Sequence, residues 1–217
     1  MKSPRQIPLK PVRVVKQRGV ALFFALICLV AIMLAAVVLV RSVDTSTMIS
    51  GNLAFQRSAT ASADAGTEAA LIWLASVEAA NGAKNVLTDP SHPFNVDDGI
   101  NGYYANLDPA KSLTASSGTR FLWDNTDSKL VGTDTATQNT TRYVIQRMCR
   151  TSGVAIKDAN CLFSDAILDN NKQNIPLPQE ICKGSGCPVA GQTPQIRITS
   201  RTTGPKNTLS YVQAFVY

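Results

Sequence analysis

Residues 16–46 read KQRGVALFFALICLVAIMLAAVVLVRSVDTS, and this stretch decides the architecture of the chain. It opens with a basic cluster and Gly19, stays uncharged through Val40 and meets the next charge at Arg41. At about 1.5 Å per residue, the 22 uncharged residues 19–40 suffice for a helix to cross about 30 Å of hydrocarbon. Three uses fit such a segment: a cleaved secretory signal, a permanent membrane anchor, or a segment that is processed and then reused.

The length of the run argues against a plain secretory signal. A signal peptide has an apolar region of about 7 to 15 residues, followed by a cleavage site made of small residues. Here the run ends in Val-Leu-Val-Arg at 38–41 instead. A buried core helix is the weaker alternative, because Arg18 and Arg41 flank the segment. We therefore expect residues 20–40 to form a transmembrane helix.

Charge predicts the orientation of this helix. The first 18 residues contain no acidic residue and six basic ones, namely Lys2, Arg5, Lys10, Arg13, Lys16 and Arg18. Basic residues beside a membrane helix tend to stay in the cytoplasm, so the rest of the chain is expected outside the inner membrane. Of the 21 Lys and Arg residues, 15 remain in residues 19–217, against 15 Asp and Glu. The basic character belongs to the leader and gives no support for nucleic-acid binding.

The cysteines agree with an exported domain. Cys28 lies in the apolar run, where a lone thiol behaves as a small apolar residue. The other four, an even number, indicate two disulfides with three possible connectivities. Short loops favour Cys149 with Cys161 and Cys182 with Cys187. A zinc site is the competing interpretation, but the spacing is irregular and His92 is the only histidine.

Residues 44–80 contain no proline and are rich in alanine, the strongest helix former, and Asn-Gly at 81–82 is a natural stop. One helix is therefore expected over 20–82. The remaining residues, 83–217, are of the size of one small domain. It begins with an irregular connection rich in Pro, Gly, Asn and Asp, and loops of this kind commonly carry recognition.

Strands are expected later in this domain, over 120–124, 142–149, 195–203 and 208–217. The strand over 208–217 is apolar on both faces and is expected to be central or covered by a helix. Gly-Pro-Lys-Asn at 204–207 predicts a hairpin turn before it. A long helix followed by antiparallel strands predicts an α+β fold with the helix on one face of the sheet.

These residues also carry a resemblance to a known family. QRGVALFFAL, the uninterrupted apolar helix and TSTMISGNLAFQRSATASADAGTEAAL together resemble the amino-terminal region of PilX-type minor pilins of type IV pilus assembly. The resemblance covers residues 17–71 well, is weaker over 142–149 and the carboxy-terminal hairpin, and is absent from 83–120. It implies a pilin-like fold in which the first half of the long helix spans the membrane.

The resemblance implies how the leader is used. Type IV prepilins carry a short basic leader that ends in glycine, and a prepilin peptidase cuts after this glycine on the cytoplasmic side. In this chain the leader is then 1–19, the cut falls between Gly19 and Val20, and Val20 becomes the N-methylated terminus. Removing six charges also frees the apolar helix to enter a filament core, which those charges would oppose.

One position departs from the family pattern. Major pilins have glutamate at the fifth mature position, where its carboxylate compensates the amino terminus of a neighbouring subunit in a core of low dielectric constant. In this chain the position is Phe24. The departure argues against a bulk-filament role and suits a subunit at the tip, which has no subunit above it to neutralise.

Enzymatic chemistry has little support in the sequence. With His92 as the only histidine, neither a serine–histidine nor a cysteine–histidine pair has a convincing frame, and His92 is expected to be a solvated loop residue. Asp97 with Asp98, and Asp124 with Asp127, could ligate calcium, but their spacing does not match the twelve-residue calcium loop. We expect no enzymatic activity, no cofactor and no resident metal.

The sequence therefore favours a minor pilin, in a priming or tip complex, that moves from the bacterial inner membrane to the pilus surface and contributes to twitching motility or adhesion. Its expected partners are other minor pilins and the major pilin through the N-terminal helix, the prepilin peptidase and the inner membrane, with no nucleic acid. Two alternatives stay open. One is a pseudopilin-like cap of a type II secretion filament, and the other is an unprocessed, membrane-anchored adhesin or binding module.

Overall fold

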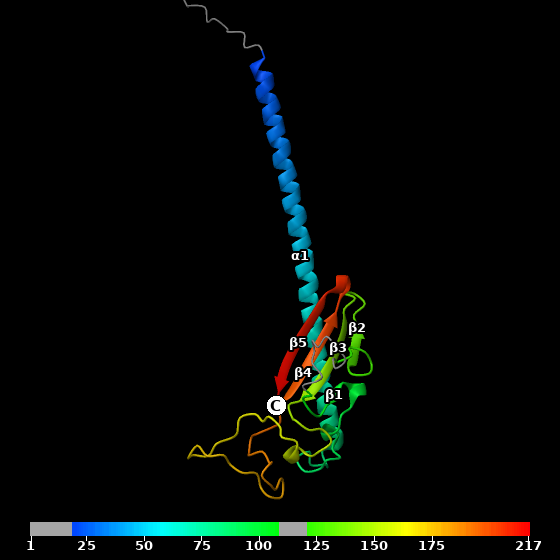
Figure 1. The fold of residues 1–217 in the computed structure, drawn as a ribbon, viewed down its shortest axis with the longest axis vertical. Coiled ribbons are helices and arrows are strands. Elements are labelled where there is room, and N and C mark those ends of the chain that lie inside the picture. The colour runs from blue at the N-terminus through cyan, green and yellow to red at the C-terminus, as the bar shows by residue number, and fades with distance from the viewer. Residues whose placement is uncertain (1–18, 109–120) are drawn as a thin grey trace, which may run out of the picture. The chain divides into compact units, whose positions relative to one another are not determined.

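The computed structural model describes residues 19–108 and 121–217, which form two compact units that divide after Gly51. The leader charges expected in the cytoplasm lie in residues 1–18, outside the described residues. The first unit contributes the apolar part of α1, and the second contains the rest of α1 and all the strands (Figure 1).

The helix α1 runs from Val20 to Asn81, close to the predicted span of 20–82. It contains no proline, the residue that would remove a backbone donor from the interior of the helix. At its end the Asn81 side-chain amide donates to the Val77 carbonyl oxygen at 2.9 Å. In the isolated chain every side chain from residue 20 to residue 50 is exposed, as expected for a segment that packs against lipid or other helices.

The second unit contains a five-stranded, mostly antiparallel sheet. Its strands are β1 (Tyr103–Tyr104), β2 (Lys129–Thr133), β3 (Thr140–Arg147), β4 (Ile196–Thr203) and β5 (Leu209–Val216). The order is β1-β3-β4-β5, with β2 antiparallel to the first half of β3 and β1 parallel to its second half. The hairpin turn predicted at 204–207 joins β4 to β5. The predicted α+β class, with a long helix packed on an antiparallel sheet, is confirmed.

One strand prediction was wrong, and another holds in one of its two alternatives. The described residues 121–124 contain no strand: residues 123–127 form a turn, and the Asp127 carboxylate accepts from the Leu122 backbone N–H just before it at 3.0 Å. The strand of this region is β2, which begins at Lys129, five residues after the end of the predicted strand. β5 is not central, since β4 is its only strand neighbour among the described residues. The other alternative holds on one face, where α1 lies against Ser210 and Val216 of β5. The apolar side chains of β5 are half-buried on one face and exposed on the other.

The helix packs on the sheet through a row of small residues. Ala59, Ala63, Gly66 and Ala70 are all buried and recur at intervals of three or four, so they share one helix face. A Cβ atom on Gly66 would clash with the Ser200 hydroxyl of β4 and lie 2.8 Å from the Thr141 methyl group of β3. The absence of large side chains thus allows α1 to lie very close to β3 and β4.

The same face is tied to the sheet by polar contacts at one end and an apolar core at the other. The Asn139 amide donates to the hydroxyls of Ser58 and Ser62, both at 2.9 Å. The core cluster comprises Ala70, Leu74, Tyr103, Ala105, Tyr143, Ile145 and Ile198. A second cluster of Tyr104, Phe121 and Val144, with Trp123 against it, covers the opposite face of β1 and β3. Because successive side chains of β3 point to opposite faces, this strand contributes residues to the clusters on both faces of the sheet.

Candidate functional site

The junction between Gly19 and Val20 is where the resemblance places processing. Val20 is the first helical residue, and Gly19 precedes it with a φ of +96°. Side chains other than glycine rarely adopt this backbone conformation. A Cβ atom on Gly19 would meet no atom of the described residues within 4 Å, so the restriction seen there is conformational and not a matter of packing. The junction is thus an exposed peptide bond directly before the helix.

The apolar segment that follows meets the requirements for membrane insertion by length and composition. Its mean hydropathy reaches 3.2, and α1 is the one such helix among residues 19–108 and 121–217. Phe24 is 61% exposed, with its ring edge to face against Phe23. No acidic side chain occurs between Val20 and Val43. This apolar helix indicates membrane anchoring or a signal segment.

The four remaining cysteines form two disulfides in the second unit. Cys149 is bonded to Cys161 and Cys182 to Cys187, the pairs that close the shortest loops. They brace residues 148–195, which contain little regular structure apart from isolated bridges and one short 3-10 turn. Cys28 is a free, exposed thiol on α1. The two disulfides indicate that the second unit lies outside the cytoplasm.

His92 does not lie in solvent, contrary to expectation. Its side chain is 1% exposed, and its Nδ1 accepts from the Phe94 backbone N–H at 3.1 Å, which caps the short 3-10 turn over Pro93–Asn95. Burial, the largest influence, lowers the pKa of His92, so the neutral imidazole is favoured. The sequence argument failed here because a capping role depends on the backbone of the next residues and is not visible in composition. His92 is a structural residue.

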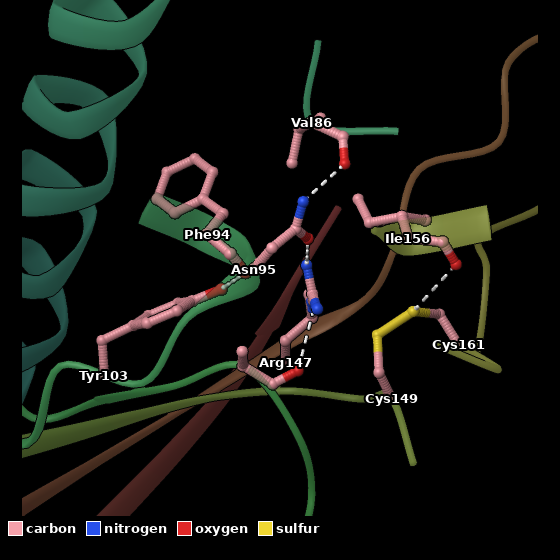
Figure 2. Close-up of a disulfide and its surroundings, with 9 residues drawn as sticks. Val86, Phe94, Asn95, Tyr103, Arg147, Cys149, Ile156 and Cys161 are labelled. Carbon is pink, nitrogen blue, oxygen red and sulfur yellow. Dashed lines mark hydrogen bonds between the residues drawn. A yellow bond between two sulfur atoms is a disulfide. The ribbon is translucent and has the colours of Figure 1, made fainter. Parts of the chain in front are cut away.

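Next to His92, Asn95 and Arg147 form a buried polar hub that the sequence analysis did not single out. Figure 2 shows Asn95 between the Val86 carbonyl and the Arg147 guanidinium. The Asn95 amide donates to the carbonyl oxygens of Val86 and Asp89 at 2.9 and 2.7 Å, and its Oδ1 accepts from Arg147 Nη1 at 2.5 Å. Arg147 Nε donates to the Ala105 carbonyl oxygen at 3.0 Å. The hub joins the loop after α1 to the ends of β1 and β3.

Arg147 is a charged residue in a buried position, which is uncommon. It is 1% exposed, its Nη2 has no hydrogen-bond partner among the described residues, and burial lowers its pKa. A signal for it exists in the sequence. In the segment RYVIQRMC, Arg147 shares a strand face with Tyr143 and Ile145, which both belong to the core. An arginine at a core position of an alternating strand predicts a buried, hydrogen-bonded guanidinium.

A cavity of about 490 Å³ adjoins this hub, between α1 and the end of the sheet. Its inner side includes the buried Tyr103 and Arg147, and its outer side includes Leu71 and Ala75 of α1 and Tyr217 after β5, which are all exposed. Most of the lining is apolar. Among the described residues, Glu78 at the helix end is the one carboxylate that lines the cavity, and Thr193 lines it as well.

The carboxylates considered for calcium are engaged in local hydrogen bonds. Asp97 accepts from the Ala105 backbone N–H at 2.7 Å, and Asp98 accepts from the backbone and side chain of Asn101. Asp124 accepts from the Thr126 N–H at 2.8 Å, and Asp127 accepts from the Tyr104 hydroxyl at 2.9 Å. Within residues 19–108 and 121–217, no group of three or more His, Cys, Asp and Glu side chains is placed to hold a metal ion. These aspartates organise turns.

No family model, no curated protein and no solved structure matches the chain. What the chain shares with type IV pilins is therefore its architecture. A long, apolar N-terminal helix packs through its second half on a carboxy-terminal antiparallel sheet, and the chain is pilin-like in this sense.

Proposed function

We propose that this protein is a minor pilin that takes part in type IV pilus assembly as a subunit of a priming or tip complex. The observation that carries the proposal is the junction at Gly19, where a basic leader ends directly before the first residue of a 62-residue helix with an uninterrupted apolar first part. A cleaved secretory signal would discard this helix. Processing at Gly19 would instead keep the apolar segment attached to the folded second unit.

Processing at Gly19 would change the charge next to the apolar helix. Six positive charges next to an apolar helix hold its end at the cytoplasmic surface, because moving them into hydrocarbon or into a helical filament core is very unfavourable. Cleavage after Gly19 removes all six. The helix that begins at Val20 can then leave the bilayer and pack against other apolar helices. Neighbouring pilins are accordingly its proposed partners along the exposed residues 20–50.

Phe24 supports a position at the tip. A glutamate at this place serves the amino terminus of a neighbouring subunit, and phenylalanine has no group that could do so. A subunit with no neighbour above it has no amino terminus to compensate, so an apolar residue is the better choice there. The same property fits the pseudopilin that caps a secretion filament, which is the related alternative.

The proposed route starts at the bacterial inner membrane. The unprocessed chain is held there with its leader in the cytoplasm, and its disulfide-containing second unit folds on the other side. After cleavage by the prepilin peptidase and N-methylation of Val20, the subunit joins the filament and reaches the cell surface. We propose no enzymatic role for it.

Deletion of the gene, with pilus retraction blocked, tests this function. If the protein primes assembly, surface pili should nearly disappear and return when the full chain is supplied. Blocking retraction matters because it removes the possibility that pili form but are withdrawn. An unprocessed adhesin would give another result, with normal pilus number and reduced surface attachment. Pilus numbers equal to those of the parent strain would contradict the assembly role.

A further inference from the structure

Lys129 and Asn101 lie side by side in the fold, although 28 positions separate them in the sequence. Lys129 is the first residue of β2, and Asn101 ends the 3-10 turn η2 (Gly99–Asn101), which precedes β1. Lys129 Nζ donates to Asn101 Oδ1 at 2.9 Å. Because β1 and β2 pair with different halves of β3, this contact lies where the two short strands meet.

Asp98, which caps η2, holds the other end of the same amide. Its Oδ2 accepts from Asn101 Nδ2 at 2.8 Å, and its Oδ1 accepts from the Asn101 backbone N–H at 3.2 Å. A lysine ammonium can only donate and an ionised carboxylate can only accept, so the two neighbours fix the orientation of the amide. The amine therefore meets the carbonyl group, and the carboxylate meets the amide nitrogen.

The backbone holds these side chains in place. Gly102 has a φ of +70°, and a Cβ atom there would lie 2.8 Å from the Tyr143 carbonyl oxygen and 2.9 Å from the Lys129 backbone nitrogen. The Gly102 carbonyl oxygen accepts from the Ile145 N–H at 2.7 Å. The chain directly after Asn101 is thus pressed against the start of β2. All three residues of the contact are half-buried, which limits the motion of their side chains.

The three side chains supply a nucleophile, an electrophile and a proton carrier. A carbonyl carbon is about 1.2 Å from its oxygen, so the Lys129 amine lies within about 4 Å of Asn101 Cγ. Attack requires a contact of about 3–3.5 Å, which a small rotation of the lysine side chain provides. A neutral lysine amine is a nucleophile toward carbonyl groups. A carboxylate in contact with the leaving nitrogen is suited to carry a proton to it.

We propose that Lys129 and Asn101 form an intramolecular isopeptide bond, with Asp98 as the proton carrier. After the lysine ammonium has lost a proton, a bond forms between its Nζ and Asn101 Cγ, and the bond between Cγ and Nδ2 breaks. A second proton moves from the attacking nitrogen through the Asp98 carboxylate to Nδ2, which leaves as ammonia and takes up the first proton. One lysine ammonium is consumed and one ammonium ion is released, without an oxidant, a cofactor or a second protein.

The bond would join the start of β2 to the turn before β1. These strands are five and two residues long, and among the described residues each has β3 as its only strand neighbour. The side of β3 that they cover is therefore held by fewer strand contacts than the side that pairs with the whole of β4. A covalent link resists separation of the two strands under a pulling force. This benefit, unlike the bond itself, rests on the proposed function in a filament.

Tryptic mapping of the purified full chain tests the bond directly. Trypsin does not cut at a lysine whose amine is in an amide, so residues 85–111 and 121–142 should appear as one branched species. Its mass should be about 17 Da below the sum of the two peptides, because one ammonia has left. Fragmentation should assign the link to Lys129 and Asn101, and the link should persist after the disulfides have been reduced.

Three variants separate the chemistry from the contact. Lys129→Arg keeps a positive charge and a donor but has no amine that can attack, so the branched species should disappear. Lys172→Arg, at an exposed position, is the matched control and should leave it unchanged. Asp98→Asn can still cap η2 but cannot carry the proton, so formation of the branched species after a pulse of synthesis should slow by about 100-fold. Formation of both disulfides verifies that each variant is folded.

Several results would overturn the proposal. These are separate peptides in the parent protein, a link that involves another residue, a branched species that persists in Lys129→Arg, or formation in Asp98→Asn at the parental rate. A loss of about 17 Da confined to residues 85–111 would do so as well, because the Gly102 backbone nitrogen would then have attacked Asn101 to form a succinimide. None of these readouts depends on processing at Gly19, so the bond and the proposed function fail separately.

Discussion

Gly66 of α1 lies directly against Ser200 of β4, so closely that a Cβ atom at position 66 would clash with the serine hydroxyl. The helix can lie this close to the sheet only because residue 66 has no side-chain carbon. Gly66 is also buried between Ala63 and Ala70, which keep the rest of this helix face equally small. The contact fixes how the second half of the helix is seated on the sheet.

Gly66→Ala should destabilise the protein, although alanine is the better helix former. Forcing a methyl group into this contact should lower the free energy of unfolding by about 1–3 kcal/mol, as in other overpacked cores. Gly132→Ala is the matched control, because a Cβ atom at position 132 of β2 meets no atom of residues 19–108 and 121–217 within 4 Å. Urea unfolding of the full chain in detergent measures both. Equal midpoints for the two variants would show that the contact at Gly66 is not tight.

Asn95→Ala should disrupt the buried hub. The substitution leaves Arg147 Nη1 and the carbonyl oxygens of Val86 and Asp89 without their partner, and each buried polar group so abandoned costs about 1–3 kcal/mol. Asn174→Ala, at an exposed position, should stay within about 0.5 kcal/mol of the parent. Thermal unfolding of the parent and the two variants measures these losses of stability. A small effect at Asn95 would mean that water replaces its hydrogen bonds.

The burial of His92 predicts that stability depends on pH. Burial lowers the pKa of His92 in the folded state, so the unfolded chain binds a proton more readily and stability is fully present above the ordinary histidine pKa. As pH falls from about 6.5 toward 5, stability should decrease by at most about 1.4 kcal/mol per pH unit. The lowered pKa values of Asp89 and Asp134 act only below their ordinary value of 3.8, so they leave this range undisturbed.

His92→Asn isolates this effect. Asparagine can cap the turn over Pro93–Asn95 through its side-chain oxygen, as His92 does through Nδ1, but it does not titrate. Urea midpoints of the full chain at pH 7.5 and 5 should differ for the parent and agree more closely for the variant. The same pH dependence in both proteins would assign the titration to another group.

Phe24→Glu tests the position at the tip. The new carboxylate should be processed normally, since the cut at Gly19 lies on the leader side of Phe24. At a tip it would be buried without an inter-subunit partner, at a cost of several kcal/mol, and pilus number should fall. Phe24→Leu, which stays apolar, should leave piliation unchanged. Unchanged piliation with glutamate, or greater incorporation along the shaft, would identify an interspersed subunit instead.

Much of the fold was predictable because it depends on local patterns. The helix over residues 20–81 follows from uninterrupted apolar and alanine-rich sequence, and the strands β3 and β4 follow from alternating side chains. The hairpin at 204–207 follows from its turn residues. Pairs of cysteines at short separations also favoured the disulfides that the structure contains.

The remainder depends on contacts between distant segments. β5 reads as apolar on both faces, yet nothing in its own residues says that no described strand lies beyond it. His92 is buried although its loop reads as solvated, and the hub of Asn95 and Arg147 joins positions 52 residues apart. Leu122 belongs to a segment whose sequence predicts a strand. It is exposed instead, and its backbone N–H donates to the Asp127 carboxylate of the following turn.

Mass spectrometry of the amino terminus tests the pilin account most directly. In sheared surface filaments, and in part of the membrane fraction, the chain should begin with N-methylated Val20. Replacing Gly19 by isoleucine should abolish this species, because its backbone has a φ of +96° that a β-branched residue strongly disfavours, and piliation should fall to the level of the deletion. A chain that begins at Met1 in every fraction, with pili present in normal number, would contradict the account.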